Sequence, residues 1–307
     1  MTRRPETPAR LVPDPDHRYR DQWQFLRRFP GYTTETRGER LTLWYRAGDI
    51  CRTLILSDAE GAVSVDGDLA LARRILQADA PALPGRNALP PDPPAHRILH
   101  RRYAGIRPVL FADPFEGIAW TILGQQITVA LAARLKQNVA QRYGSPAEGA
   151  ARPLFVFPSP DRVARASIDD LRSLQLSRQK AEALVGVARA LAAGQWTPAL
   201  AAEQPAEETI TRLRQFRGIG RWSAEYILLR VLGHPDVLPA GDAALQRAWA
   251  RLTGVAGRAA EDCLRRAGDA WTGRRSDFAF ALWLDNLAAR RRPELSSSTP
   301  SGPPGGD

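Results

Sequence analysis

Cysteine is nearly absent from this chain: Cys51 and Cys263 are the only two in 307 residues. Two thiols cannot complete a four-cysteine iron–sulfur site or a structural zinc site. Two cysteines do not suggest a framework of disulfides. The lack of such a framework is typical of a protein in a reducing compartment. The sequence therefore predicts a cytoplasmic protein without an iron–sulfur cluster.

Long apolar runs are absent as well. No segment offers about 18 unbroken apolar residues, the length that a membrane-spanning helix needs. The first 16 residues are rich in proline and arginine and lack the apolar stretch of a signal peptide. We therefore expect neither secretion nor insertion into a membrane.

Lysine is the third scarce residue. Lys136 and Lys180 are the only lysines among 43 basic residues, so arginine carries nearly all of the positive charge. The net charge is +10 and the isoelectric point is near 10.5. This balance favours a polyanionic partner such as nucleic acid, although a general preference for arginine on the surface would produce the same numbers.

What is present is enough apolar sequence for a packed core, since hydrophobic residues make up 44% of the chain. We expect disordered tails at 1–18 and 292–307, the second of which is polar and rich in glycine and proline. Residues 19–80 are expected to form a small α+β domain with an antiparallel sheet. In that domain Leu41, Leu43 and Tyr45 alternate with other residues, as in a half-buried strand.

A Pro-rich linker region is expected at 81–107, where prolines cluster before position 95. Helical patterns dominate from 108 to 291, which is expected to be one helical domain. The expected helices are 113–143 with a break near Gly124, 161–174, 178–193, 206–216, 220–232, 242–252, 258–267 and 276–290.

The most informative stretch is a glycine turn followed by one carboxylate. Phe216-Arg217-Gly218-Ile219-Gly220 reads as a tight turn between two helices, where glycine permits positive φ and leaves the backbone N–H groups uncovered. Such groups at the start of a helix attract a phosphate oxygen. Asp242 follows 22 residues after Gly220. A turn that grips the DNA backbone beside one carboxylate suggests an enzyme acting on DNA.

The stretch from Leu213 to Trp249 resembles the helix-hairpin-helix/Gly-Pro-Asp superfamily of DNA glycosylases, and within it the bacterial 3-methyladenine DNA glycosylase II family. Segments 113–135, with Ile-Leu-Gly-Gln-Gln, and 157–191 extend the resemblance over roughly 108–290. It implies an α+β fold with a mainly helical two-part body, a helix-hairpin-helix at 206–232 and a small N-terminal antiparallel-sheet domain. It also implies excision of alkylated purines such as 3-methyladenine and 7-methylguanine from double-stranded DNA, by base flipping and hydrolysis of the N-glycosidic bond.

Asp242 stands at the family's catalytic position. An alkylated purine carries positive charge and leaves readily, so one carboxylate that stabilises the oxocarbenium character of the sugar is sufficient. The alternative is that Asp242 only caps the helix that starts at Ala243, because Gly-Asp-Ala-Ala is a good capping sequence. Both roles are compatible.

Aromatic residues are expected to form the wall of the base pocket. Trp222 and Tyr226 are four residues apart and share one helix face. Such a wall attracts a cationic base through cation–π interaction, although the same spacing is also typical of plain core packing. By resemblance Trp283 is a third aromatic position, Leu284 replaces a tyrosine, and Gln125 also belongs to the pocket.

Trp222 also bears on the type of glycosylase. In lyase-competent relatives a lysine follows the Gly-x-Gly-Arg sequence and forms a Schiff base with the sugar. Here Trp222 follows Arg221, and neither Lys136 nor Lys180 resembles that nucleophile. The sequence therefore predicts base removal without AP-lyase activity.

Two further sets of residues are expected to contact DNA. By resemblance Gln126 takes the place of the side chain that enters the duplex, with Ile127 as the alternative; a glutamine that merely solvates a helix kink is equally compatible. Arg217 and Arg221 flank the turn, where they either pair with phosphates or form an ordinary solvated surface.

No cofactor is expected to be required. The resemblance implies a structural monovalent cation, Na⁺ or K⁺, bound at the hairpin by the backbone carbonyls of Arg214, Phe216 and Gly218. The expected partner is double-stranded DNA with alkylated bases, bound by a monomer in the bacterial nucleoid. The alternatives are an oxidised-base or mismatch glycosylase of the same superfamily and a non-catalytic helix-hairpin-helix DNA-binding protein.

Overall fold

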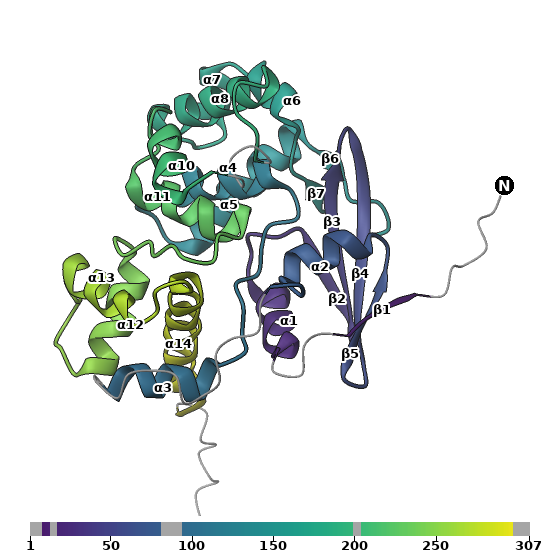
Figure 1. Ribbon diagram of the computed structural model, residues 1–307. Helices are drawn as coiled ribbons and strands as arrows, with labels where there is room; N and C mark the ends of the chain where they lie inside the picture. The colour runs from purple at the N-terminus through teal and green to yellow at the C-terminus, as the bar shows by residue number, and fades with distance from the viewer. Residues whose placement is uncertain (1–7, 13–16, 81–93, 199–203, 297–307) are drawn as a thin grey trace, which may run out of the picture.

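The computed structural model describes residues 8–12, 17–80, 94–198 and 204–296. Figure 1 shows a small sheet at one side and two groups of helices beside it. The upper group contains α4 to α8, α10 and α11, and the lower group contains α3 and α12 to α14. The prediction of a mainly helical two-part body with an N-terminal antiparallel sheet is confirmed.

Five antiparallel strands form the sheet, in the order β1-β5-β4-β3-β2. Their bounds are β1 (Ala9–Leu11), β2 (Thr34–Arg37), β3 (Arg40–Ala47), β4 (Ile50–Ala59) and β5 (Ala62–Asp66).

Strand β3 is covered on both faces at Trp44. Leu43 faces the main core, as the alternation predicts, but Trp44 is only 3% exposed on the opposite side. The chain that carries the short hairpin β6 (Ser145–Pro146) and β7 (Phe155–Val156) covers it, and Trp44 Nε1 donates to the carbonyl of Glu148 at 2.9 Å. The strand is therefore fully buried there rather than half-buried.

The helices follow the predicted pattern closely. Their bounds are α1 (Tyr19–Arg28), α2 (Leu69–Leu76), α3 (Pro94–Tyr103), α4 (Pro114–Gly124), α5 (Val129–Tyr143), α6 (Pro160–Ala164), α7 (Ile168–Ser173), α8 (Arg178–Ala192), α10 (Ala206–Leu213), α11 (Arg221–Ile227), the π-helical segment η1 (Leu228–Leu232), α12 (Ala243–Thr253), α13 (Glu261–Asp269) and α14 (Arg275–Ser296).

Two expected helices are divided. The helix expected at 161–174 becomes α6 and α7, because Ser167 starts a new helix by accepting a bond from the N–H of Asp170 at 3.0 Å. The helix expected at 220–232 changes from α11 to the wider η1. Segments of π-helix are rare and are often found at functional sites.

Three segments that were expected to be irregular contain regular structure. Within the expected tail 1–18, β1 pairs with β5 and Leu11 is fully buried. Helix α3 lies in the expected linker and buries Leu99, and α14 continues into the second expected tail. The burial of apolar side chains stabilises β1 and α3, although the proline-rich composition of both segments had predicted irregular structure. Within the three expected segments, residues 1–7, 13–16, 81–93 and 297–307 lie outside the described residues.

The sheet-bearing part and the helical body share one core. Phe25 of α1 meets Phe280 of α14 with ring centroids 5.0 Å apart, and Phe29 meets Trp120 of α4 at the same distance. A buried ion pair of Lys136 with Glu116 lies near the same boundary. This continuous packing fixes the position of α1 against the helices that carry the candidate site.

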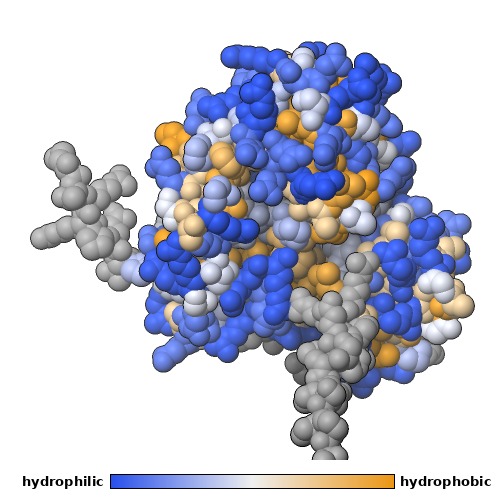
Figure 2. All heavy atoms as spheres, turned by 180° about the vertical axis from the view of Figure 1, so that it is seen from behind, coloured by the Kyte–Doolittle hydropathy of each residue, from blue (hydrophilic) through white to orange (hydrophobic). Residues whose placement is uncertain are grey.

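The described helices include none that combines the length and the apolar composition required to cross a membrane. Seen from behind in Figure 2, the surface is largely hydrophilic, and hydrophobic residues show in patches on the upper half and where it meets the rest of the molecule.

Candidate active site

The glycine turn joins α10 to α11 as the sequence predicts. Gly218 has φ +84°, in the left-handed region, and a Cβ there would lie 2.8 Å from the Cβ of Ala183. Gly218 is therefore required both by the turn and by the close approach of α8. The N–H groups of the first turn of α11 have no partner within the helix.

Gly220 differs from the expectation of positive φ. Its φ is −86° and its ψ is 179°, an extended conformation that any residue can adopt. A Cβ at Gly220 would meet nothing within 4 Å. The fold therefore does not require glycine at this position, and the space beside it is open to a ligand.

Asp242 caps α12, as the structural alternative predicted. Its Oδ1 accepts bonds from the N–H groups of Ala244 at 2.8 Å and Leu245 at 3.0 Å. Its other oxygen, Oδ2, accepts a bond from the indole Nε1 of Trp222 at 3.2 Å. The carboxylate is half-buried and is fixed through both oxygens, so its orientation is set before any substrate arrives.

The three aromatic residues singled out in the sequence are adjacent. Trp222 and Tyr226 on α11 have centroids 5.7 Å apart, and Tyr226 lies 5.4 Å from Trp283 on α14. Tyr226 is buried, whereas Trp222, Trp283 and the neighbouring Leu284 are half-buried. We call Trp222, Tyr226 and Trp283 the aromatic wall. It crosses from the upper to the lower helical group and begins beside Asp242.

Gln125 at the end of α4 is bonded to the hairpin. Its Nε2 donates to the carbonyl of Gly218 at 2.7 Å and to Oγ of Ser223 at 2.9 Å. The side chain amide therefore fixes the turn relative to α4. The carbonyl of Phe216 also accepts a bond, from the N–H of Ile219 at 3.0 Å. Each of these carbonyls keeps a second lone pair, so the two bonds leave the three-carbonyl cation set of Arg214, Phe216 and Gly218 as a prediction.

In the segment after α4, Gln126 is exposed to solvent, and Ile127 is not. Gln126 is exposed and has φ +58°, which is uncommon for a residue other than glycine. Ile127 is partly buried against the core. Lys180 of α8 donates to the backbone carbonyls of Leu123 and Gln125, the latter at 2.9 Å. Burial lowers the pKa of Lys180 from its ordinary value.

Arg221 takes part in an ion-pair network instead of remaining free. Its guanidinium lies 2.6 Å from Glu207 and 2.9 Å from Glu225. Glu225 is only 2% exposed and also pairs with Arg265 at 3.0 Å. Burial raises the pKa of Glu225, and the bonds from Arg265 and Arg221 oppose that rise. Arg221 is therefore not a simple solvated surface residue, and its contact with a phosphate stays a prediction.

Arg217 remains accessible at the hairpin. Its side chain is 78% exposed and its guanidinium lies 3.1 Å from Glu182 of α8. An ion pair of this exposure is weak, so Arg217 can exchange Glu182 for another anion.

Arg230 packs against two rings of the aromatic wall and was not singled out in the sequence. It is 1% exposed, and its guanidinium carbon is 5.9 Å from the centroid of Tyr226 and 6.0 Å from that of Trp283. Lys180, Ser223 and Glu225 were also missed as parts of the site. Only Lys180 carried a signal, as one of two lysines in an arginine-rich chain.

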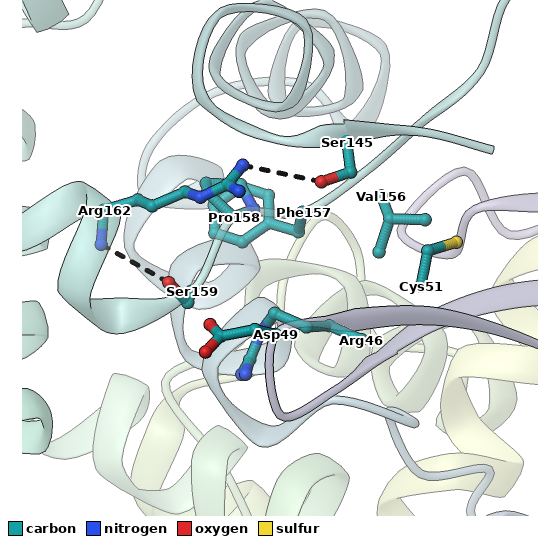
Figure 3. A pocket seen from close by; sticks show the side chains of 9 residues that line it. All are labelled: Arg46, Asp49, Cys51, Ser145, Val156, Phe157, Pro158, Ser159 and Arg162. Atoms are coloured by element: carbon teal, nitrogen blue, oxygen red, sulfur yellow. Dashed lines mark hydrogen bonds between the residues drawn. The ribbon is translucent and has the colours of Figure 1, made fainter.

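A separate small hollow lies between the sheet and the helical body (Figure 3). Arg162 donates from its Nη1 to Oγ of Ser145 and from its backbone N–H to Oγ of Ser159, and Arg46 pairs with Asp113 at 3.0 Å. Of these contacts the pair of Arg46 with Asp113 joins the sheet to the helical body, and none of the groups belongs to the aromatic wall. The lining residues are Arg46, Asp49, Cys51, Ser145, Val156, Phe157, Pro158, Ser159 and Arg162.

Comparison with known families identifies the class of protein. The family model described as "HhH-GPD superfamily base excision DNA repair protein" matches residues 119–272, which include the hairpin, Asp242 and most of the helical body. The chain belongs to this superfamily, as the resemblance predicted.

Curated relatives are similar over part of their length. A DNA-3-methyladenine glycosylase of Bacillus subtilis (strain 168) is 30% identical over 190 residues, 62% of this chain and 63% of the relative. DNA-3-methyladenine glycosylase 2 of Escherichia coli (strain K12) is 32% identical over 179 residues, 58% of this chain and 60% of the relative. The chain thus spans about three fifths of the length of these two relatives.

The fold is shared more widely. A solved structure described as 3-methyladenine DNA-glycosylase from Archaeoglobus fulgidus superposes with a TM-score of 0.77 at 24% identity, over 91% of this chain and 98% of that chain. This likeness covers the sheet-bearing part as well as the helical body, so the N-terminal sheet belongs to the shared fold.

Proposed function

We propose that this protein is a monofunctional DNA glycosylase that excises alkylated purines in base excision repair. One observation carries the proposal: the carboxylate of Asp242 is fixed through both oxygens and lies beside an aromatic wall. The glycosylase names of the curated relatives support the same activity.

The hairpin supplies the contact with the DNA backbone. The first N–H groups of α11 lack intrahelical partners, and at Gly220 no side chain stands in the way of a phosphate oxygen. The exposed Gln126 enters the duplex and compensates part of the lost stacking when the base is flipped out. The apolar side chain of Val129, 52% exposed, follows it in sequence and adds contact area.

The flipped base stacks between the half-buried faces of Trp222 and Trp283. The C1′–N bond then breaks with its electron pair going to the base, and positive charge develops on the sugar. Asp242 stabilises that charge and orients the water whose oxygen bonds to C1′. The cap bonds and the bond from Trp222 hold the carboxylate in place, so little reorganisation accompanies the reaction.

Neither lysine of the chain is placed to act as an amine nucleophile. Trp222 occupies the position after Arg221, the ammonium of Lys136 pairs with Glu116, and that of Lys180 is held by two carbonyls. The product is therefore an abasic site in an unbroken strand.

The test compares wild type with Asp242→Asn in single-turnover release of 7-methylguanine from duplex DNA. Asparagine is as good a helix cap as aspartate, so the fold of α12 is retained while the negative charge is lost. We expect a loss in rate on the order of 10²–10³ and unchanged DNA affinity. A rate within about threefold of wild type, far short of that loss, would contradict the assignment.

Asp262→Asn is the matched control, because Asp262 is an exposed carboxylate in the first turn of α13. It should leave the rate unchanged. The same reaction, resolved on a gel without alkaline treatment, should show an intact strand, and borohydride should trap no protein–DNA adduct.

A further inference from the structure

Arg230 is a buried cation enclosed by aromatic rings. It extends from η1, and its guanidinium carbon lies within 6.0 Å of six ring centroids. The nearest ring is Phe25 at 4.9 Å. Three of the rings belong to helices α1 and α14, so the charge is located where the sheet-bearing part meets the base pocket.

The charge has only neutral partners among the described residues. Arg230 Nε donates to the carbonyl of Val109 at 2.7 Å, and its Nη2 donates to the hydroxyl of Tyr32 at 2.7 Å. No described carboxylate lies within ion-pair distance of it. Without a carboxylate in direct contact, the charge of Arg230 acts on the surrounding rings together with the more distant carboxylates of Asp242 and Glu116.

The field acts on only part of the aromatic wall. The guanidinium carbon lies over one face of Tyr226 and of Trp283, whereas Trp222 lies beside the carboxylate of Asp242 and is not among the six rings. A cation on one face of a ring draws electron density toward it and makes the opposite face less attractive to a second cation.

We propose that Arg230 sets the charge preference of the base pocket, by disfavouring cationic bases and favouring purines that leave as anions. The inference rests on the proposed function and deepens it. Alkylated purines remain substrates, and Arg230 makes a neutral purine lesion such as hypoxanthine a better substrate, relative to them, than an aromatic wall alone would.

The two classes of base differ in charge during the reaction. When the C1′–N bond of 7-methylguanine breaks, the base takes the electron pair and leaves neutral; water oxygen bonds to C1′ and its proton goes to solvent. Hypoxanthine takes the electron pair and leaves as an anion, which accepts the proton of that water. A fixed positive charge behind the base therefore stabilises the second transition state and opposes binding of the first substrate.

The experiment measures single-turnover release of 7-methylguanine and of hypoxanthine from otherwise identical duplexes. Arg230→Met and Arg230→Gln both remove the charge, and glutamine can keep a bond to the Val109 carbonyl. A base stacked on the face of Trp283 opposite to Arg230 lies about 9 to 10 Å from the guanidinium, because a contact distance of about 3.5 Å adds to the 6.0 Å between the guanidinium carbon and the ring centroid. At an effective dielectric constant of about 20, we expect the ratio of 7-methylguanine to hypoxanthine release to rise about 3- to 20-fold.

Tyr32→Phe is the matched control. It removes a hydrogen bond from the same buried cluster and keeps the charge, so the ratio should stay within about twofold of wild type, as expected when the field is unchanged. All variants are first shown to be folded by urea unfolding. An unchanged ratio in a folded variant without the Arg230 charge would overturn the proposal.

Measurements of affinity for the two duplexes distinguish a failure of this inference from a failure of the proposed function. If wild type releases neither base, the proposed function fails, and the same substitutions are compared in the Asp242→Asn background by their affinity for the two duplexes. Loss of the charge should then favour the duplex with 7-methylguanine, and equal affinities before and after the substitution would overturn the role of Arg230.

Discussion

Trp222 joins two parts of the candidate site in one side chain. Its indole N–H orients Asp242, and its ring begins the aromatic wall. The two contributions can be separated, because phenylalanine keeps an aromatic ring at this position and removes the N–H donor, whereas alanine removes both.

Trp222→Phe is expected to slow release of 7-methylguanine and hypoxanthine to a similar extent. The bond to a charged acceptor is lost for both substrates, which corresponds to about 10-fold or more in rate. Trp222→Ala is expected to lose a further 2- to 30-fold on 7-methylguanine, roughly the cation–π contribution, relative to hypoxanthine. Single-turnover release by each variant gives both ratios.

The stability of Trp222→Ala must be measured first. Truncating a packed tryptophan typically costs about 3–5 kcal/mol and can unfold the domain. Equal losses on both substrates in folded Trp222→Ala protein would show that Trp222 is a packing residue without charge preference.

At the scale of elements, the two glycines of the hairpin have different tasks. Gly218 combines positive φ with close contact to Ala183 and a carbonyl bonded to Gln125. Gly220 has ordinary dihedral angles and open space around it. The first glycine therefore serves the fold, and the second serves access to the backbone N–H groups.

Alanine substitution at the two positions should separate stability from DNA affinity. Gly218→Ala is expected to lower the free energy of unfolding by roughly 2–3 kcal/mol, from backbone strain and overpacking. Gly220→Ala should change it by less than about 1 kcal/mol. Gly220→Ala should nonetheless weaken binding to DNA of any sequence by about tenfold, the value of a hydrogen bond to a charged group. Urea unfolding and fluorescence anisotropy measure the two quantities.

Each of these two expectations has an outcome that would contradict it. Full DNA affinity in Gly220→Ala would remove the hairpin from the proposed interface, and a fully stable Gly218→Ala protein would show that the turn does not depend on the left-handed conformation.

The charge of the whole molecule determines how strongly it is drawn to DNA. With a net charge of +10, the logarithm of the affinity should fall linearly with the logarithm of the salt concentration, with a slope of about 0.9 for each phosphate contacted. Replacing Arg217 with glutamine should lower that slope by about one. The control is Arg40→Gln, an exposed arginine of β3, which belongs to the sheet on the other side of the molecule from α10 and α11 in Figure 1, and it should leave the slope unchanged. A slope near zero would contradict electrostatic binding to the backbone.

Much of the site follows from signals that act within a few residues. The turn at Gly218, the capping sequence at Asp242 and the spacing of Trp222 and Tyr226 on one helix face all appear in the structure as the sequence predicts, whereas Gly220 lacks the expected positive φ. Each depends on local backbone geometry, which is why the amino-acid order alone is sufficient to predict it.

Tertiary packing decides the contacts between segments that are distant in sequence. It places Trp283 against Tyr226, bonds Gln125 to Gly218 and turns Arg221 toward carboxylates rather than leaving it free. It also encloses the charge of Arg230 among rings from several elements. No local pattern marks such partners, because they are selected by which faces are buried together when α11, α12 and α14 pack, and that is a property of the whole core.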